Sequence, residues 1–169
     1  MIPKSACGAV APSARRRPAG VAVEVSNRQR RLKINTPLLA EAAERTLEFV
    51  GKANGQLSIV LVDDATIARL NVEYHGVRGP TDVLSFDYGE GQGELILSVQ
   101  QAVIHAKRFR TTPARELILY LVHGILHLHG FDDLTPAKRR RMRAAERRVM
   151  AWLQKHVKCG DLTRRRTAK

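Results

Sequence analysis

The sequence contains no long run of apolar residues. The apolar stretch Leu117–Val122 stops at His123, far short of the roughly 18–20 residues that a membrane-spanning helix needs. The N-terminus also has no apolar core of the kind found in secretory signals. Its arginine-rich, alanine-rich and acid-poor start is typical either of a transit peptide or of a short disordered arm. We therefore expect no association with a membrane.

Cysteine is scarce as well. Cys7 and Cys159 lie near opposite ends of the chain, in polar and basic surroundings. Nothing in the sequence favours a disulfide between them, so a reducing intracellular compartment is the simpler hypothesis, and we expect a cytoplasmic protein. A length of 169 residues without a visible internal repeat predicts one domain with a buried core, and we expect a monomer.

Acidic residues are few at both ends of the chain. Residues 1–33 hold eight Lys and Arg against one acidic residue, and residues 136–169 hold thirteen against two, whereas the middle carries a net charge of −5. Basic ends around a folded core indicate a polyanion partner, with RNA or DNA as the first candidate. The alternative is a pair of solvated tails that only aid solubility. We expect a disordered basic arm over 1–20, a domain over 21–157 and a basic C-terminal tail over 158–169.

Hydrophobic periodicity and capping signals predict an α/β (α+β) fold, in which a sheet of about four strands is packed by helices. Thr36-Pro37 and Thr112-Pro113 both have the pattern of an N-cap followed by proline in the first helical turn. The helix that opens at Pro113 is apolar on nearly every side, and we expect it at the centre of the fold. The expected strands are 21–25, 56–62, 81–88 and 94–99, and the expected helices are 36–50, 64–74, 99–108, 113–130 and 135–157.

His123 and His127 give the strongest chemical signal in the chain. Four residues apart on a helix, their imidazoles share one face with Cβ atoms about 6 Å apart, and both can reach one Zn²⁺ ion at about 2.0–2.1 Å. Gly130 stands where a helix can end in the left-handed conformation, so the chain can fold back and offer Asp133 as a third ligand. Three protein ligands with an open fourth position are typical of a catalytic zinc site. Such a histidine pair on its own is more often a packed pair in the core.

Glu116 and His129 lie near this histidine pair in the sequence. Glu116 lies seven residues before His123 on the same helical face, where it can orient a ligand histidine or simply interact with the helix dipole. His129 follows His127 by two residues and so points about 200° away around the helix. We expect His129 to be a surface or packing residue and not a ligand.

Several short motifs occur in order between about residues 57 and 150. In combination, order and spacing they resemble the YbeY family, the bacterial single-domain metal-dependent endoribonucleases of ribosomal RNA maturation. No single motif is that specific, but the combination is. The motifs are Leu70-Asn71 with Tyr74, Pro80–Phe86, Gly93–Ser98, Arg115-Glu116-Leu117, His123–Asp133, and Met142 with Glu146.

The resemblance implies a single-strand-specific endoribonuclease with one Zn²⁺ ion per chain. It further implies a role in ribosomal RNA 3′-end processing and ribosome quality control, with the RNA precursor as substrate and the ribosome or ribosomal proteins as partners. On the family's pattern His123 and His127 are metal ligands, and Asp133 stands where the family has a third histidine. Asp132 matches an aspartate that the family carries beside this ligand, and we expect it to support the ligand or shape the turn.

The phosphate-binding position also departs from the family's pattern. The family usually places an arginine directly after the aromatic residue of the Leu-Asn segment, whereas this chain has His75 there and Arg78 three residues later. A guanidinium meets two phosphate oxygens at once and stays charged at every working pH. We therefore expect Arg78 to hold the scissile phosphate, with a protonated His75 as the alternative. The change from the family's Gly-Asp-Ile to Gly93-Glu94-Leu95 is mild.

Two other functional classes fit part of the sequence. The histidine spacing also resembles metzincin-type zinc peptidases, but these need a glutamate directly after the first histidine, and this chain has Gly124. The other alternative is a non-catalytic RNA- or ribosome-binding factor whose zinc is structural. The last helix is richer in arginine than an amphipathic helix requires, which fits either RNA hypothesis. The residues that we expect to contact RNA are Arg139, Arg140, Arg143 and Arg147.

Overall fold

A computed structural model of the protein describes residues 20–52 and 54–164. Nearly all of the arm predicted over 1–20 and the last part of the predicted tail lie outside the described residues. The α/β class predicted from the sequence is confirmed. In chain order the elements are β1 (Val21–Asn27), β2 (Lys33–Ile34), α1 (Thr36–Phe49), β3 (Gly55–Val62), α2 (Asp64–His75), β4 (Val83–Gly89), β5 (Gln92–Ser98), α3 (Val99–Phe109), α4 (Pro113–Leu128), α5 (Pro136–His156), a 3₁₀ helix (Cys159–Leu162) and β6 (Thr163–Arg164).

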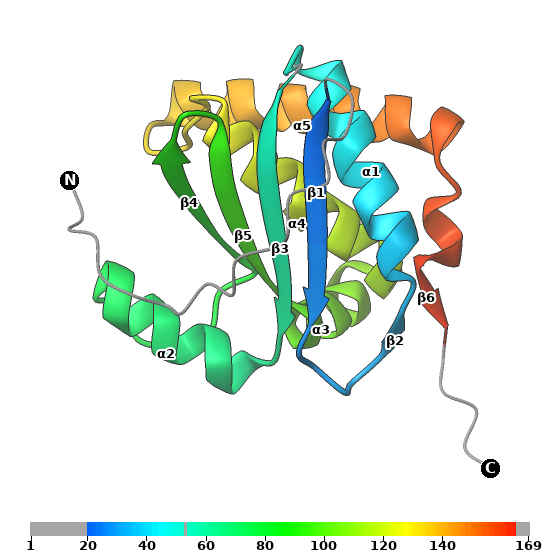
Figure 1. Ribbon diagram of the computed structural model, residues 1–169. Helices are drawn as coiled ribbons and strands as arrows, with labels where there is room; N and C mark the ends of the chain where they lie inside the picture. Colours follow the sequence, from blue (N-terminus) through cyan, green and yellow to red (C-terminus); the bar gives the residue numbers. More distant parts are fainter. Residues whose placement is uncertain (1–19, 53, 165–169) are drawn as a thin grey trace, which may run out of the picture.

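Four strands form the main sheet in the order β1-β3-β5-β4 (Figure 1). β1, β3 and β5 are parallel, and β4 pairs with β5 as an antiparallel edge strand. Because successive side chains of a strand point to opposite faces, β3 contributes to two cores. Leu57, Ile59 and Leu61 enter the large core, whereas Val60 and Val62 enter a small one.

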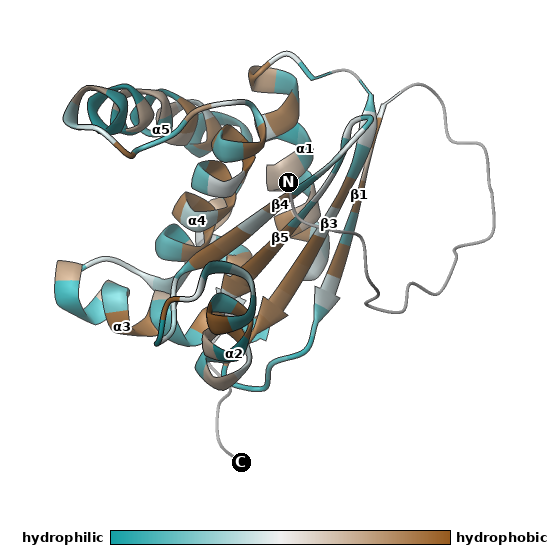
Figure 2. Ribbon diagram, turned by 90° about the vertical axis from the view of Figure 1, so that its left-hand side faces the viewer, coloured by the Kyte–Doolittle hydropathy of each residue, from teal (hydrophilic) through white to brown (hydrophobic). Residues whose placement is uncertain are grey.

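Helices cover the two faces of the sheet unequally. Side chains of α1, α3, α4 and α5 build the large core on one face, whereas Ile67 of α2 joins the small core on the other. Figure 2 shows α3, α4 and α5 on the same side of the sheet. No helix among the described residues is both long enough and apolar enough to cross a membrane.

The helix α4 is the central helix, as its composition predicted. Leu117, Leu121 and Ile125 are completely buried, and each such side chain contributes about 1.5–3 kcal/mol through removal from water. The predicted cap is present, because Thr112 Oγ1 accepts a hydrogen bond from Arg115 N–H. The helix packs against α1, α3, α5, β4 and β5 at once, so its side chains are fixed from several directions.

Two boundaries differ from the sequence-based expectation. The cap of α1 is Asn35, whose Oδ1 accepts from Leu38 N–H, and Thr36 is already helical; asparagine is the stronger N-cap of the two. The folded part also continues beyond the expected domain end at 157. The 3₁₀ helix buries Leu162 in the large core, and β6 pairs antiparallel with β2. A two-residue strand is too short to show a periodicity in the sequence.

Candidate metal centre

The helix α4 places His123 and His127 one turn apart on the same side. Their Nε2 atoms face each other at 2.9 Å, and their ring centroids are 4.5 Å apart. Both side chains are half-buried. The helical spacing thus produces the shared face that the sequence predicted.

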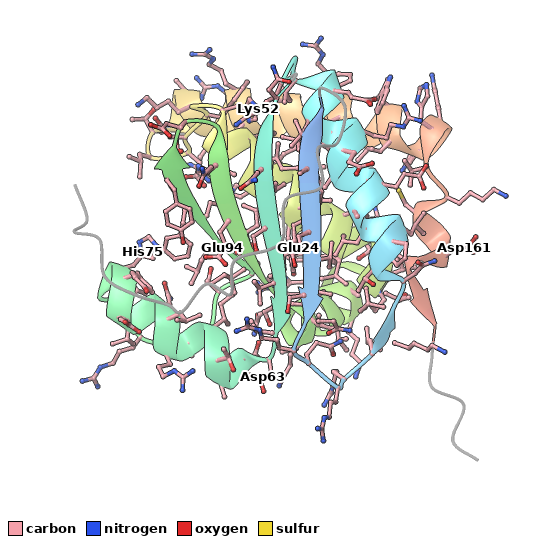
Figure 3. The ribbon with its side chains drawn as sticks, viewed as in Figure 1. Glu24, Lys52, Asp63, His75, Glu94 and Asp161 are labelled. Atoms are coloured by element: carbon pink, nitrogen blue, oxygen red, sulfur yellow. The ribbon has the colours of Figure 1, made fainter. Side chains whose placement is uncertain are left out.

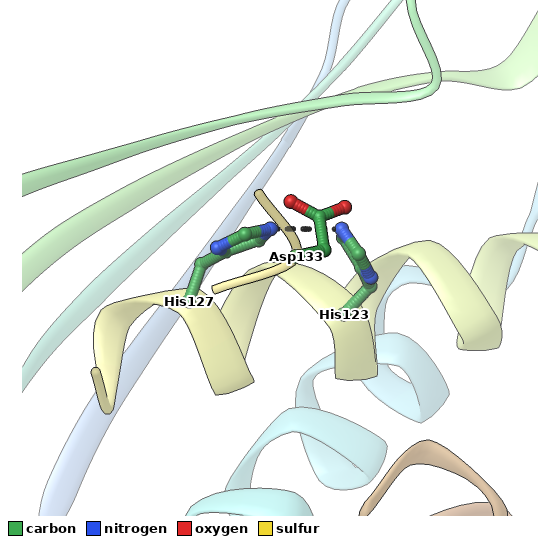
Figure 4. Close-up of side chains that lie close together, drawn as sticks. All are labelled: His123, His127 and Asp133. Atoms are coloured by element: carbon green, nitrogen blue, oxygen red, sulfur yellow. Dashed lines mark hydrogen bonds between the residues drawn. The ribbon is translucent and has the colours of Figure 1, made fainter. Parts of the chain in front are cut away.

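The chain folds back directly after this pair. Gly130 has a φ of +82°, a conformation that glycine adopts without the steric penalty of a Cβ atom. Its N–H donates to the His127 carbonyl at 3.0 Å, and Phe131 N–H donates to the Leu126 carbonyl at 3.1 Å, which is the Schellman pattern of a helix end. As a result, a carboxylate oxygen of Asp133 and one ring nitrogen of each histidine lie within 4.8 Å of one another (Figure 4).

The loop that carries Asp133 is tied to the first turns of α5. Asp132 Oδ2 accepts from Lys138 Nζ at 2.7 Å, and its Oδ1 accepts from Leu134 N–H at 3.3 Å. The hydrogen bond from Lys138 is also the main cause that lowers the pKa of Asp132. The Arg139 guanidinium donates to the backbone carbonyl of Asp133 at 3.1 Å. Asp132 therefore shapes the turn, and the carboxylate of Asp133 remains available to a metal.

A carboxylate of α5 contacts His123, a role that was not predicted from the sequence. Glu146 Oε1 lies 2.6 Å from His123 Nδ1. Glu116 could, from the sequence, either orient His123 or interact with the helix dipole; its backbone lies about 10 Å from that of His123 along the helix axis. It is 4% exposed and accepts a hydrogen bond from the Thr111 hydroxyl, so it stabilises the turn before α4. The sequence did hold a signal for this role, because Glu146 is the one acidic residue in the arginine-rich helix α5.

The two ligand histidines have pKa shifts in opposite directions. For His123, burial lowers the pKa, but the hydrogen bond and charge of Glu146, aided by Asp82 and Asp133, outweigh it and raise the pKa overall. For His127, burial and the charge of His123 prevail over Asp133 and lower the pKa. In the metal-free protein His123 therefore takes up a proton first as the pH falls. Metal binding must displace that proton, which makes the affinity pH-dependent.

Gly124 lies between the two ligand histidines on the side of α4 that faces the sheet. A Cβ atom at this position would stand 2.7 Å from Leu95 Cδ2 and 3.2 Å from Ser85 Oγ. Any larger residue at this position would force Leu95 or the helix to shift. The glutamate that a metzincin peptidase uses as its general base has no room here. The chain therefore lacks the general base that a metzincin-type peptidase requires.

Three other histidines of the described chain have partners of their own. The His129 ring donates through Nδ1 to a backbone carbonyl of α4 at 2.8 Å. His105 Nδ1 lies 2.6 Å from the Tyr120 hydroxyl. His156 donates to the Trp152 carbonyl at 2.7 Å and stacks on its ring. The group of candidate ligands contains none of the three.

Comparison with known proteins identifies the family. The family model described as Endoribonuclease YbeY matches residues 24–154. The chain belongs to the YbeY family. Endoribonuclease YbeY from Geobacter metallireducens is 38% identical over 144 residues, which cover 79% of this chain and 96% of that protein. Endoribonuclease YbeY from Symbiobacterium thermophilum is 36% identical over 132 residues, which cover 69% and 85%.

A solved structure shares the fold of this YbeY family member. The solution structure of TM1509 from Thermotoga maritima aligns with a TM-score of 0.54 and 24% sequence identity. The alignment covers 83% of this chain and 95% of that one. The order of elements is therefore that of a known small α/β domain.

In this YbeY family member the two candidate phosphate-binding residues lie at the end of α2. His75 is the last residue of the helix, and Arg78 lies in the loop that leads to β4; both are exposed. Figure 3 shows His75 at the edge of the sheet, beside β4. Asn71 Nδ2 donates to the Gly79 carbonyl at 3.0 Å and fixes the loop. Within the described chain neither side chain bonds to the metal group, so phosphate binding stays a prediction.

The four arginines of α5 that we expect to contact RNA divide into two groups. Arg140, Arg143 and Arg147 follow one another at spacings of three and four, so they share one flank of the helix; we call them the arginine stripe. All three are exposed. Arg139 is also exposed, but its guanidinium binds the loop that carries Asp133. Contact between these residues and RNA stays a prediction.

Proposed function

We propose that this chain is a metal-dependent endoribonuclease that cuts single-stranded RNA during ribosomal RNA maturation. The observation that carries the proposal is the donor group of His123, His127 and Asp133, two imidazole nitrogens and a carboxylate oxygen within 4.8 Å of one another. Three such protein ligands with room for another are the donor set of a catalytic zinc site. The relatives named Endoribonuclease YbeY supply the class of reaction.

The same donor group supports Zn²⁺ as the metal, one ion per chain, because zinc prefers imidazole nitrogen and carboxylate oxygen in this number. When bound, the ion supplies Lewis-acid catalysis, polarising a phosphoryl oxygen and making water a better nucleophile at neutral pH. Asp133 in place of a third imidazole leaves less net positive charge on the metal. His123 and His127 must both be deprotonated at the nitrogens that face the ion, which favours binding at neutral or alkaline pH.

The RNA backbone is expected to lie across the loop after α2 and along α5. Arg78 is the better phosphate ligand of the two candidates, because a guanidinium is charged at every working pH and meets two phosphate oxygens at once, whereas an imidazole is cationic only when protonated. The helix α5 begins at Pro136, directly after the loop that carries Asp133. The arginine stripe thus extends from the metal group along one flank of α5 and can bind the phosphates next to the cut.

The proposed substrate is a ribosomal RNA precursor in the cell. The basic ends of the chain fit a polyanion such as a ribosomal RNA precursor, bound on or near the ribosome. We propose processing at a 3′ end, by a monomer, in the cytoplasm. Sedimentation of the tagged protein with ribosomal subunits in cell extracts, and its size in solution, test these points.

The central experiment pairs metal analysis with RNA cleavage. Purified protein should contain about one zinc per chain and cut a single-stranded RNA but not the matching duplex. Chelation should abolish cleavage, and added Zn²⁺ should restore it. Arg78→Ala should reduce cleavage at least about tenfold, equal to about 1.4 kcal/mol of transition-state stabilisation, with zinc content unchanged.

Two outcomes would contradict the proposal. A zinc-loaded protein that binds RNA tightly without cutting it is a binding factor with a structural metal. Cleavage that survives chelation and the Asp133→Ala substitution comes from another site or from a contaminant. If His75→Ala and not Arg78→Ala lowers cleavage, the phosphate-binding role belongs to His75.

A further inference from the structure

Glu146 makes a direct contact with a metal ligand from a different helix. Its Oε1 lies 2.6 Å from His123 Nδ1, and the side chains of His123 and Glu146 are only 23% and 16% exposed. This is the short distance of a hydrogen bond that involves a charged carboxylate. Because water is largely excluded from the pair, the contact holds the ring more firmly than an exposed one would.

The surroundings of Glu146 indicate that this contact is the reason for its position. It lies on the face of α5 that packs on α4, and the neighbouring residues one turn away, Met142, Val149 and Met150, are buried. A carboxylate is seldom placed on such a face unless a partner compensates its loss of water. Among the described residues, the hydrogen-bond and ion-pair partner of Glu146 is His123.

The contact determines which nitrogen of His123 faces the metal group. A carboxylate accepts hydrogen bonds, so its partner nitrogen Nδ1 carries the proton, and Nε2 then keeps its lone pair. The same Nε2 faces His127 Nε2 at 2.9 Å, where the donor atoms gather. One carboxylate therefore selects the tautomer of His123 and fixes the direction of its ring.

We propose that Glu146 is a positioning residue of the metal centre, which holds His123 in the tautomer that offers Nε2 to the ion. This inference rests on the proposed metal site, and it does not depend on the RNA-cleaving activity. Outer carboxylates of this kind raise metal affinity by about 10–100-fold in other metal sites. Metal affinity is thus coupled to the docking of α5 on α4.

The test uses the full-length protein and three substitutions. Glu146→Ala removes the carboxylate, and Glu146→Gln keeps its shape but removes its charge. The matched control is Glu116→Gln, since Glu116 is a buried carboxylate that bonds to Thr111 and not to a ligand. Zn²⁺ affinity is measured by competition with a chromophoric chelator. The tautomer of His123 is measured by ¹⁵N NMR of the metal-free protein, with the pH raised until the His123 signals no longer change and the ring is neutral.

Glu146→Ala should weaken Zn²⁺ binding by about 10–100-fold and shift the ¹⁵N signals of His123 away from the Nδ1–H tautomer. Glu146→Gln should lose less affinity, because its amide oxygen still accepts from Nδ1–H. Glu116→Gln should lower thermal stability but leave both readouts unchanged. The Gln variant also serves if the Ala variant fails to fold.

The inference is overturned if Glu146→Gln and Glu146→Ala bind Zn²⁺ as tightly as the natural protein, or if the His123 signals do not move. Equal losses in Glu116→Gln would also overturn it, because the effect would then come from a weakened fold. Failure of the proposed metal site gives a different result, since the natural protein itself would then bind no Zn²⁺.

Discussion

Replacing Gly124 by alanine tests how closely α4 must approach the sheet. At an exposed helical position this change stabilises a protein by about 1 kcal/mol, because glycine is a poor helix former. Here the new Cβ atom would lie 2.7 Å from Leu95 Cδ2, about 1 Å inside the distance of 3.5–4.0 Å that carbon atoms prefer. Leu95 is 0% exposed, so its side chain cannot move into solvent to relieve the clash without disturbing the core.

The clash should outweigh the gain in helix propensity. Overpacking of a close-packed core costs about 1–3 kcal/mol, and about 1 kcal/mol of propensity is set against it. We therefore expect Gly124→Ala to lower the free energy of unfolding by about 1 kcal/mol, which is about 2–4 °C in Tm for a chain of this size. Thermal unfolding of the metal-free protein, followed by circular dichroism, measures the change. Zn²⁺ affinity should fall as well, because His123 and His127 flank the displaced position.

A double-mutant cycle separates the clash from other effects. Leu95→Ala alone should cost about 2–5 kcal/mol, but with Gly124→Ala the new methyl group enters part of the vacated space. The double variant should then be more stable than the sum of the single changes predicts, by at least about 0.5 kcal/mol. Gly130→Ala is the control, because no atom lies within 4 Å of its added Cβ and only the backbone strain at φ +82° remains. A stabilised Gly124→Ala variant, or a strictly additive cycle, would refute the reasoning.

Three further predictions concern the metal loop, the basic helix and the free thiol. Asp133→Ala should lose most of its bound zinc on desalting, whereas Asp132→Ala should retain more; elemental analysis showing full zinc in Asp133→Ala would place the third ligand elsewhere. Changing the whole arginine stripe to glutamine should make RNA binding less dependent on salt. The slope of log K against log salt should become shallower by about 0.7 per lost phosphate contact, with zinc content unaltered. An unaltered slope would show that this flank of α5 does not contact RNA. Burial raises the pKa of the Cys159 thiol, so in a Cys7→Ser background its alkylation should begin at a higher pH than that of free cysteine, and an equal onset would contradict the burial.

Local signals in the sequence predicted most of the helices. Ser98, Thr112 and Thr135 each accept a hydrogen bond from the N–H three residues later, as N-caps do. Gly130 ends α4 in the left-handed conformation for a reason that is equally local. The position of Asp133 is also set by a local signal, because the turn at Gly130 directs the chain back toward His123 and His127.

Features that depend on tertiary packing could not be predicted in this way. Glu146 is 23 residues from His123 in the sequence, and only the docking of α5 on α4 brings them together. Glu116 shares a helical face with His123, but seven residues of helical rise separate the two by about 10 Å. A shared face alone therefore does not predict a contact between them. The pairing of β2 with β6 joins two-residue segments from opposite ends of the fold, so neither segment carries a pattern of its own.

The pairing of β2 with β6 also has a consequence for the order of folding. Asn35 N–H donates to the Leu162 carbonyl at 2.9 Å, and Leu162 lies in the large core. A ribosome delivers a chain from its N-terminus, so residues near Leu162 leave the tunnel after the sheet and α4 have already emerged. Until then α1 lacks part of its packing. His123 likewise has no contact with Glu146 until α5, which follows α4 in the chain, has emerged. The contact between His123 and Glu146 therefore forms only after α5 has emerged and docked on α4, so the histidines of the proposed metal site emerge earlier than the carboxylate that contacts one of them.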